Sequence, residues 1–87
     1  MLKSFEWDSH NLSHIQEHHV NYLEVEEAFD RKHYFFRTRN DRYILLGRSA
    51  MGRYLFIVFI RKGQGTARVI SARNRTQRDR RLYRRKI

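Results

Sequence analysis

The fold is decided by residues 54–73, which read YLFIVFIRKGQGTARVISAR. The first seven residues of this stretch are all apolar or aromatic. Such a run, followed closely by glycine, is typical of a strand buried on both faces. The Gly-rich segment 62–65 predicts a hairpin loop, so residues 66–72 should pair back onto the first strand. Arg73 then stands at the end of the returning strand, where the most basic part of the chain begins.

Two further strands precede this hairpin, and a short strand opens the chain. Residues 33–37 and 42–48 are rich in aromatic and aliphatic side chains, and Asn40-Asp41 between them is a turn signal. In residues 5–8 apolar and polar side chains alternate, which predicts a short half-buried strand. Consecutive strands with short turns favour antiparallel pairing. We therefore expect a four-stranded antiparallel meander of residues 33–37, 42–48, 54–61 and 66–72.

Two helices are predicted between the short first strand and the meander. Asp8 or Ser9 can cap a helix over residues 9–19, whose apolar residues recur at helical spacing. Asn21 begins a second helix, because Glu24 three residues later completes a capping-box pattern. This second helix ends at residues 30–32 and concentrates acidic residues in an otherwise basic protein.

The C-terminal segment is predicted to form a basic helix. Thr76 and Asp79 repeat the capping-box pattern, which places this helix from Gln77 to about Lys86. It is rich in arginine and has few large apolar residues, so it either docks weakly or serves as a binding element. The order of strand, two helices, four strands and helix defines an α+β fold in a single domain of residues 1–87. We expect the helices to pack on one face of the sheet.

The chain carries a formal net charge of +10, because Lys and Arg outnumber Asp and Glu by 19 to 9. Most of the excess is Arg, which contacts phosphate bidentately and stacks on bases. A polyanionic partner is therefore expected, either RNA, DNA or an acidic protein. The alternative is a generally basic surface that serves solubility.

Composition also excludes some classes of protein. The 87 residues contain no cysteine, so neither a disulfide framework nor a thiolate metal site can form. This composition fits the reducing cytoplasm, which is the expected location. No segment approaches the roughly 18 apolar residues needed to span a membrane, so no membrane partner is expected.

The histidines suggest two kinds of chemistry. His10, His14 and His18 recur every four residues, but the last is rotated by about 80° from the first around a helix. Because no Cys can complete a ligand set, we expect solvent-facing histidines and no metal site. Imidazole can also transfer protons in RNA cleavage. His18 is the best candidate for this role, since it flanks the apolar stripe near a helix end, and structural capping or packing is the alternative.

The arginines at strand ends are the second candidate site. Cleavage of a phosphodiester builds negative charge in the transition state, and guanidinium groups on a rigid strand end would stabilise it. Arg48, Arg73 and Arg78 are expected to reach one edge of the sheet. The same residues could also bind phosphate without catalysis. The second helix offers three candidate general bases, Glu24, Glu26 and Glu27. Such glutamates more commonly form a solvated helix face.

Aromatic side chains offer a third kind of contact with RNA. Trp7, Tyr34, Tyr54 and Tyr83 could stack on splayed bases. Core packing is the commoner role of such residues. Tyr83 lies in the exposed helix and is therefore the one that we expect to stack.

Two groups of short motifs follow one another in a recognisable order. The N-terminal group is Phe5-Glu6-Trp7-Asp8, Asn11, His18-x-Val20 and Glu26-x-Ala28-Phe29. The C-terminal group is Gly47-Arg48-Ser49-x-x-Gly52-Arg53, Arg68-x-Ile70-Ser71-Ala72-Arg73 and Thr76-x-Arg78-Asp79-Arg80-Arg81-x-Tyr83. Their order and spacing over nearly the whole chain resemble the BrnT-like toxins.

The resemblance implies a ribonuclease toxin of a type II toxin–antitoxin pair, with a fold similar to RelE-type toxins. It implies RNA cleavage without metal or cofactor, inhibition of growth, and neutralisation by an antitoxin. In this family the antitoxin typically carries a ribbon-helix-helix part, through which the complex binds operator DNA. The catalytic residues implied are His18, Arg48, Arg73 and Arg78. Further contacts with RNA are expected from Lys3, Trp7, Arg53, Arg75 and Tyr83.

Two positions depart from the pattern of that family. Its usual Lys-His-Gly before the second helix is Glu17-His18-His19 here, so a negative charge replaces a positive one beside His18. Arg75 stands where a small residue is usual.

Two other functions compete with RNA cleavage. The first is a non-catalytic basic module that binds nucleic acid or a partner, with strong dependence on salt. The second is a basic surface that serves mainly to bind an acidic antitoxin helix. On the cleavage hypothesis, the site lies at the Arg73 end of the returning strand and faces the Arg48 end of the strand over residues 42–48.

Overall fold

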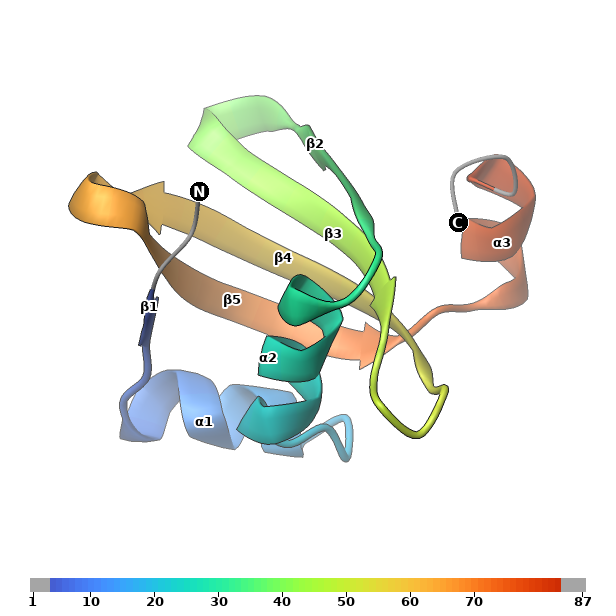
Figure 1. Cartoon of the computed structure of the whole chain (residues 1–87), viewed down its shortest axis with the longest axis horizontal. Coiled ribbons are helices and arrows are strands. Elements are labelled where there is room, and N and C mark those ends of the chain that lie inside the picture. Colours follow the sequence, from blue (N-terminus) through green and yellow to red (C-terminus); the bar gives the residue numbers. More distant parts are fainter. Residues whose placement is uncertain (1–3, 84–87) are drawn as a thin grey trace.

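The computed structural model describes residues 4–83 (Figure 1). The strands are β1 (Ser4–Glu6), β2 (Tyr34–Arg37), β3 (Arg42–Arg48), β4 (Tyr54–Lys62) and β5 (Thr66–Asn74). The helices are α1 (Ser9–Gln16), α2 (Tyr22–Asp30) and α3 (Gln77–Leu82). Short 3₁₀ turns at Arg39–Asp41 and Gly63–Gly65 connect β2 to β3 and β4 to β5. The predicted α+β class and order of elements are confirmed.

The sheet differs from the predicted four-stranded meander. It has five strands in the order β1-β5-β4-β3-β2, and it is mixed. Strands β2 to β5 pair antiparallel with their chain neighbours, whereas β1 pairs parallel with β5. The expectation of a purely antiparallel sheet is therefore wrong. A three-residue strand carries no pattern that tells which distant edge it will join, because pairing with β5 depends on residues some 60 positions away.

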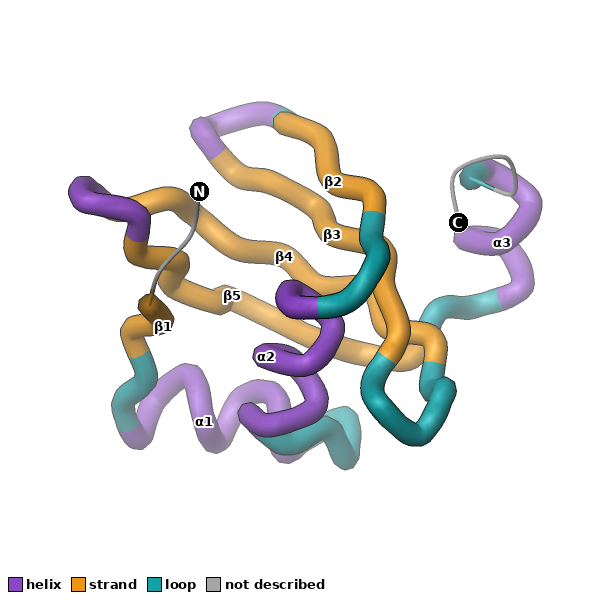
Figure 2. The backbone as a smooth tube through the Cα atoms, viewed as in Figure 1, coloured by secondary structure: helices purple, strands orange, loops and turns teal. Residues whose placement is uncertain are grey.

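Strand β4 lies in the middle of the sheet and has one fully buried face. Its residues Leu55, Ile57 and Phe59 are at most 1% exposed, whereas the alternate residues are only half-buried or exposed. The prediction of burial on both faces is thus met on one face alone. Helices α1 and α2 cover the buried face, and α3 stands apart at the end of the sheet (Figures 1 and 2). The expectation that all helices pack on one face is therefore wrong for α3.

A bulge in β5 decides where its terminal arginine points. Val58 pairs with Ser71, but its neighbour Phe59 pairs with Val69, so β5 holds one extra residue. Side chains alternate along a strand, so in a regular strand Val69 and Arg73, four residues apart, would share the helix-covered face. With the extra residue, Arg73 pairs with Phe56 and lies on the opposite face.

All three helices begin with a capping box, as Asp8, Asn21 and Thr76 each accept a hydrogen bond from the backbone three residues on. The predicted starts are therefore confirmed. Helix α3 ends at Leu82, with Tyr83 no longer helical, so the extension to about Lys86 is wrong at Tyr83. Residues 84–86 lie outside the described part of the chain.

Helix α1 ends at Gln16, three residues before the predicted end. His19 has a φ of 59°, in the left-handed region, which ends a right-handed helix. Two backbone bonds close the turn: the His19 amide donates to the Gln16 carbonyl at 2.9 Å, and the Val20 amide donates to the Ile15 carbonyl at 3.2 Å. This bonding is the Schellman arrangement, in which the left-handed position is usually glycine.

Replacing His19 with glycine should therefore stabilise the fold by about 1 kcal/mol, because it removes the cost of a Cβ at positive φ. The measurement is urea unfolding of His19→Gly against wild type. His18 lacks a positive φ and is the matched control, so His18→Gly should lower stability. An unfolding midpoint for His19→Gly below that of wild type would contradict this reading of the turn.

Candidate active site

Three strand ends meet where β3 ends, β4 begins and β5 ends. Arg48 pairs with Tyr54 across β3 and β4, and Phe56 pairs with Arg73 across β4 and β5. Arg48 and Arg73 therefore lie at the same end of the sheet, two strands apart. The chain then passes Arg75 and enters α3, so the basic helix begins next to this end.

Three guanidinium groups gather around one tyrosine at this end. The guanidinium carbons of Arg48, Arg75 and Arg80 lie 5.1, 5.3 and 5.6 Å from the centre of the Tyr54 ring. We call these four residues the Tyr54 cluster. Burial lowers the pKa of Arg75, and the positive charge of Arg80 lowers it further. Like charges thus crowd one another here, which is typical of a site that receives an anion.

Arg73 lies beside this cluster and is ion-paired. Its guanidinium group sits 4.1 Å from the centre of the Phe56 ring and donates to Asp79 of α3 at 2.7 Å. Asp79 is 6% exposed, and it also accepts from the Thr76 amide at 2.8 Å. Burial raises the pKa of Asp79, but hydrogen bonds from Arg73 and Thr76 outweigh burial and leave it below its ordinary value. Asp79 thus ties α3 to the end of β5 and compensates the charge of Arg73.

The lowered pKa of Asp79 predicts how its contribution to stability changes with pH. A carboxylate whose pKa is lower in the folded state contributes stability above its unfolded pKa, and that contribution is lost as the pH falls through the folded value. Asp79→Asn should therefore be less stable than wild type at neutral pH, by about 2 kcal/mol. This difference in stability should become smaller as the pH falls below the ordinary pKa of a carboxyl group. Thermal unfolding of both proteins from neutral to acidic pH measures this difference. A difference independent of pH would contradict the stabilising role of the ionised Asp79 carboxylate.

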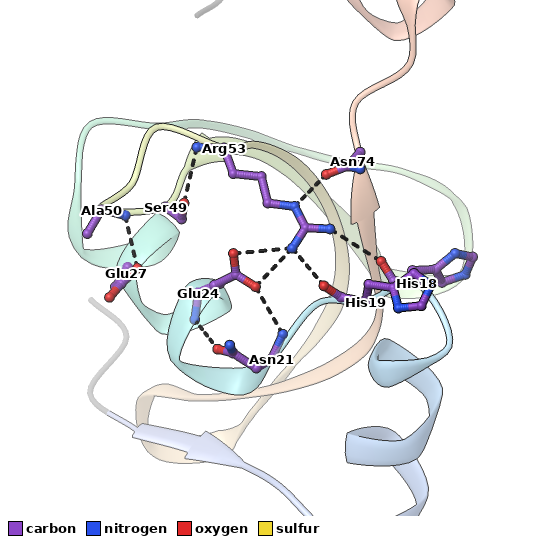
Figure 3. A network of polar contacts seen from close by, with 9 residues as sticks. All are labelled: His18, His19, Asn21, Glu24, Glu27, Ser49, Ala50, Arg53 and Asn74. Carbon is purple, nitrogen blue, oxygen red and sulfur yellow. Dashed lines mark hydrogen bonds and ion pairs between the residues drawn. The ribbon is translucent and has the colours of Figure 1, made fainter.

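Arg53 is the centre of a polar network that joins four segments (Figure 3). It donates from Nε to Asn74 Oδ1 at 2.6 Å and from Nη1 to Glu24 Oε1 at 3.0 Å. It also donates from Nη1 to the His19 carbonyl at 2.7 Å and from Nη2 to the His18 carbonyl at 3.3 Å. These bonds tie the β3–β4 loop to the end of β5, the α1–α2 turn and the first turn of α2.

The β3–β4 loop is shaped to deliver Arg53 to this network. The Ser49 amide donates to the Arg53 carbonyl at 2.9 Å, and the Arg53 amide donates to the Ser49 hydroxyl at 3.1 Å. Gly52 has a φ of 89°, which glycine adopts without cost. Glu27, predicted as a possible general base, accepts from the Ala50 amide at 2.9 Å and so fixes the same loop.

In the described part of the chain, His18 joins this network through its backbone carbonyl only, and its side chain does not contact the arginines predicted as catalytic. Its side chain is exposed, and its ring centre lies 6.3 Å from that of His14. Within residues 4–83 no hydrogen bond joins its imidazole to Arg48, Arg73 or Arg78. Arg78 is exposed on α3, without an ion pair inside this part of the chain. The structure therefore groups Arg48 with Arg73 and leaves His18 and Arg78 at the margin.

The residues predicted to contact RNA are spread more widely. Trp7 donates from its ring nitrogen to Glu26 at 2.8 Å and packs near Tyr22, on the helix side of the sheet. The ring of Tyr83 lies 5.3 Å from that of Phe36, so it is half-buried against β2. Arg75 joins the Tyr54 cluster, and Arg53 is bound within the protein. Lys3 lies outside the described residues, and all these roles in RNA binding stay predictions.

Sequence reasoning did not single out Arg80 or Asp79, and it favoured core packing for Tyr54. The capping box was a usable signal for Asp79, because it turns that carboxylate back toward the start of α3, where β5 ends. No comparable signal existed for the gathering of Arg80 and Arg48 on one ring.

Residues 4–83 contain no group of three His, Cys, Asp or Glu residues close enough to hold a metal ion. None of the helices there is long and apolar enough to cross a membrane.

A basic α+β fold with arginines gathered at one sheet end is typical of proteins that bind a polyanion. Comparison with known proteins makes this specific. Residues 7–79 match the family model described as the ribonuclease toxin BrnT of type II toxin–antitoxin systems. The chain belongs to this family of ribonuclease toxins. It therefore acts on RNA and has an antitoxin as its partner.

A solved structure supports the fold. The crystal structure of the Brucella abortus ribonuclease toxin BrnT matches with a TM-score of 0.69 and 23% identity. The match covers 85% of this chain and 97% of that one. No curated protein matches the chain significantly. The likeness to RelE-type toxins stays a prediction.

Proposed function

We propose that RNA is cleaved at the arginine-rich end of the sheet, without a metal ion, by attack of a ribose 2′-hydroxyl on the adjacent phosphorus. The observation that carries this proposal is the gathering of four arginines where β3, β4 and β5 meet: Arg48, Arg73, Arg75 and Arg80. Guanidinium groups held in place by a sheet stabilise the charge that develops on the phosphoryl oxygens.

The proposed reaction needs no water and no cofactor. The 2′-oxygen forms a bond to phosphorus and loses its proton to a general base, while the 5′-oxygen leaves and takes up a proton. The products are a 2′,3′-cyclic phosphate and a 5′-hydroxyl. Arg48 and Arg73 would contact the scissile phosphate, Arg78 would support them from α3, and His18 would transfer protons.

The remaining residues would bind the flanking nucleotides. Arg75 is best placed for this, since it shares Tyr54 with Arg48. Tyr83 would stack on a base. Trp7 and Arg53 are the weaker members of the proposed set, because both already bind within the protein. Lys3 completes the set.

Incubation of the purified chain with RNA in EDTA tests the proposal. Fragments ending in 2′,3′-cyclic phosphate, with 5′-hydroxyl partners, are the expected products. An oligonucleotide with 2′-deoxyribose at the cleaved position is the matched control and should stay intact. Cleavage of that control, or cleavage only on addition of a divalent metal, would contradict the mechanism. Tight, salt-sensitive binding without cleavage would favour the non-catalytic module instead.

We further propose that the toxin acts in the cytoplasm and is neutralised by an antitoxin with an acidic segment and a ribbon-helix-helix part. The net charge of +10 supports an acidic partner surface. Operator DNA would be bound only through the antitoxin in the complex. Growth arrest on expression of the chain, relieved by co-expression of a short neighbouring gene of that kind, is the expected result.

A further inference from the structure

Tyr54 is the point of contact for three segments that are separate in the chain. Arg48 ends β3, Arg75 lies in the link after β5, and Arg80 lies within α3. All three place their guanidinium carbons within 5.1–5.6 Å of the centre of its ring. Tyr54 is 38% exposed, so a ligand can approach the cluster from solvent.

Two arginines of the cluster, Arg48 and Arg80, bring positive charge that is not ion-paired within the described residues. Among residues 4–83, no carboxylate forms an ion pair with Arg48 or Arg80. The nearby carboxylate of Asp79 is bound to Arg73 instead, at 2.7 Å. Burial lowers the pKa of Arg75, and the charge of Arg80 lowers it further, so like charges lie close together in this cluster. Cations held together in this way are stabilised when an anion binds between them.

The ring explains how these groups stay together. The flat face of a guanidinium group stacks on an aromatic face, which leaves the N–H edges free to donate. Those edges match the oxygens of a phosphate, which accept two parallel hydrogen bonds from one arginine. A second arginine–tyrosine pair, Arg61 over Tyr43 at 5.7 Å, lies at the opposite end of β4 and holds one cation only.

We infer that Tyr54 and the three arginines on its ring, Arg48, Arg75 and Arg80, form one binding site for a phosphodiester of RNA. In this site the ring of Tyr54 is a positioning residue, and Arg80 is a phosphate ligand. The inference rests on the proposed site of cleavage, because it names the groups that bind phosphate there. Its test measures binding alone, so the binding site can be confirmed even if the protein does not cleave RNA as proposed.

The experiment measures the affinity of the full chain for a single-stranded 2′-O-methyl oligonucleotide, which cannot be cleaved by 2′-hydroxyl attack. Each titration is repeated over a range of salt concentrations. The variants are Tyr54→Leu, Tyr54→Phe and Arg80→Gln, with Arg61→Gln as the control that removes one charge at the other end of β4. Thermal unfolding checks that each variant is folded.

Tyr54→Phe should bind like wild type, because the ring remains. Tyr54→Leu should weaken binding by at least about tenfold, since its arginines lose their common platform. Arg80→Gln should weaken binding and lower the slope of log affinity against log salt by about 0.7, the value for one phosphate contact with a single strand. Arg61→Gln should leave both the affinity and the slope nearly unchanged.

Three results would overturn the inference. Equal losses for Arg80→Gln and Arg61→Gln would mean that the whole surface binds RNA diffusely. Wild-type affinity and slope for Arg80→Gln would mean that Arg80 does not contact phosphate, whatever Tyr54→Leu does to the fold. A loss in Tyr54→Phe as large as in Tyr54→Leu would assign the effect to the hydroxyl and remove the role of the ring.

Discussion

Arg73→Ala should lower the rate of RNA cleavage by about 10²–10³-fold, the usual cost of removing one group that stabilises transition-state charge. The bulge in β5 leaves Arg73 on the face opposite α1 and α2, over Phe56 and beside the Tyr54 cluster. There its guanidinium group lies at the end of three paired strands, which limits its movement. The measurement is the single-turnover rate on a defined RNA in EDTA.

The ion pair between Arg73 and Asp79 makes a control necessary, because Arg73 also anchors α3. Asp79→Asn breaks the ion pair but keeps Arg73, and its amide oxygen can still accept hydrogen bonds from Thr76. If Arg73 acts on RNA, Asp79→Asn should cleave within about tenfold of wild type under conditions where it is folded. Equal losses in Arg73→Ala and Asp79→Asn would instead make Arg73 an anchor for α3.

Arg53→Ala should lower the free energy of unfolding by about 3 kcal/mol. Its guanidinium group donates from all three nitrogens, to a carboxylate, an amide and two backbone carbonyls. Removing it leaves Glu24 without its ion-pair partner and releases the α1–α2 turn from the end of β5. Urea unfolding, followed by circular dichroism, measures the loss.

Two variants sharpen this prediction. Arg37→Ala breaks an ion pair whose side chains are both exposed, so it should cost less than about 1 kcal/mol. Arg53→Lys keeps the charge but lacks the planar fork, so it should recover only part of the loss. If Arg53→Ala were as stable as wild type yet bound RNA weakly, Arg53 would be an RNA ligand and the network would be unimportant for folding.

The features predicted correctly from the sequence are local ones. The boxes at Asn21 and Thr76 depend on residues three positions apart, and the hairpin after β4 depends on a short Gly-rich loop. The features missed depend on distant residues. The sequence of β1 does not encode its pairing with β5, and no residue type marks the extra residue at the bulge.

The candidate site shows the same division. Arg48 and Arg73 could be placed at one sheet end, because antiparallel strands fix which termini meet. Tyr54 and Arg80 could not be assigned to this site from the sequence. The Arg73–Asp79 ion pair brings α3 to the sheet end, and no sequence pattern predicts that pair. Arg53 has the residue type of an RNA ligand, and only its four partners show that it binds within the protein.

The central claim is that RNA cleavage takes place at the end of the sheet where Arg48 lies. Arg48 and Arg61 make a matched pair, because each places its guanidinium carbon over a tyrosine ring, at 5.1 and 5.7 Å, at opposite ends of the sheet. The direct measurement is the single-turnover cleavage rate of Arg48→Gln against Arg61→Gln. The account predicts a loss of at least about 10²-fold for Arg48→Gln and a rate near wild type for Arg61→Gln. Equal rates for the two variants would contradict it.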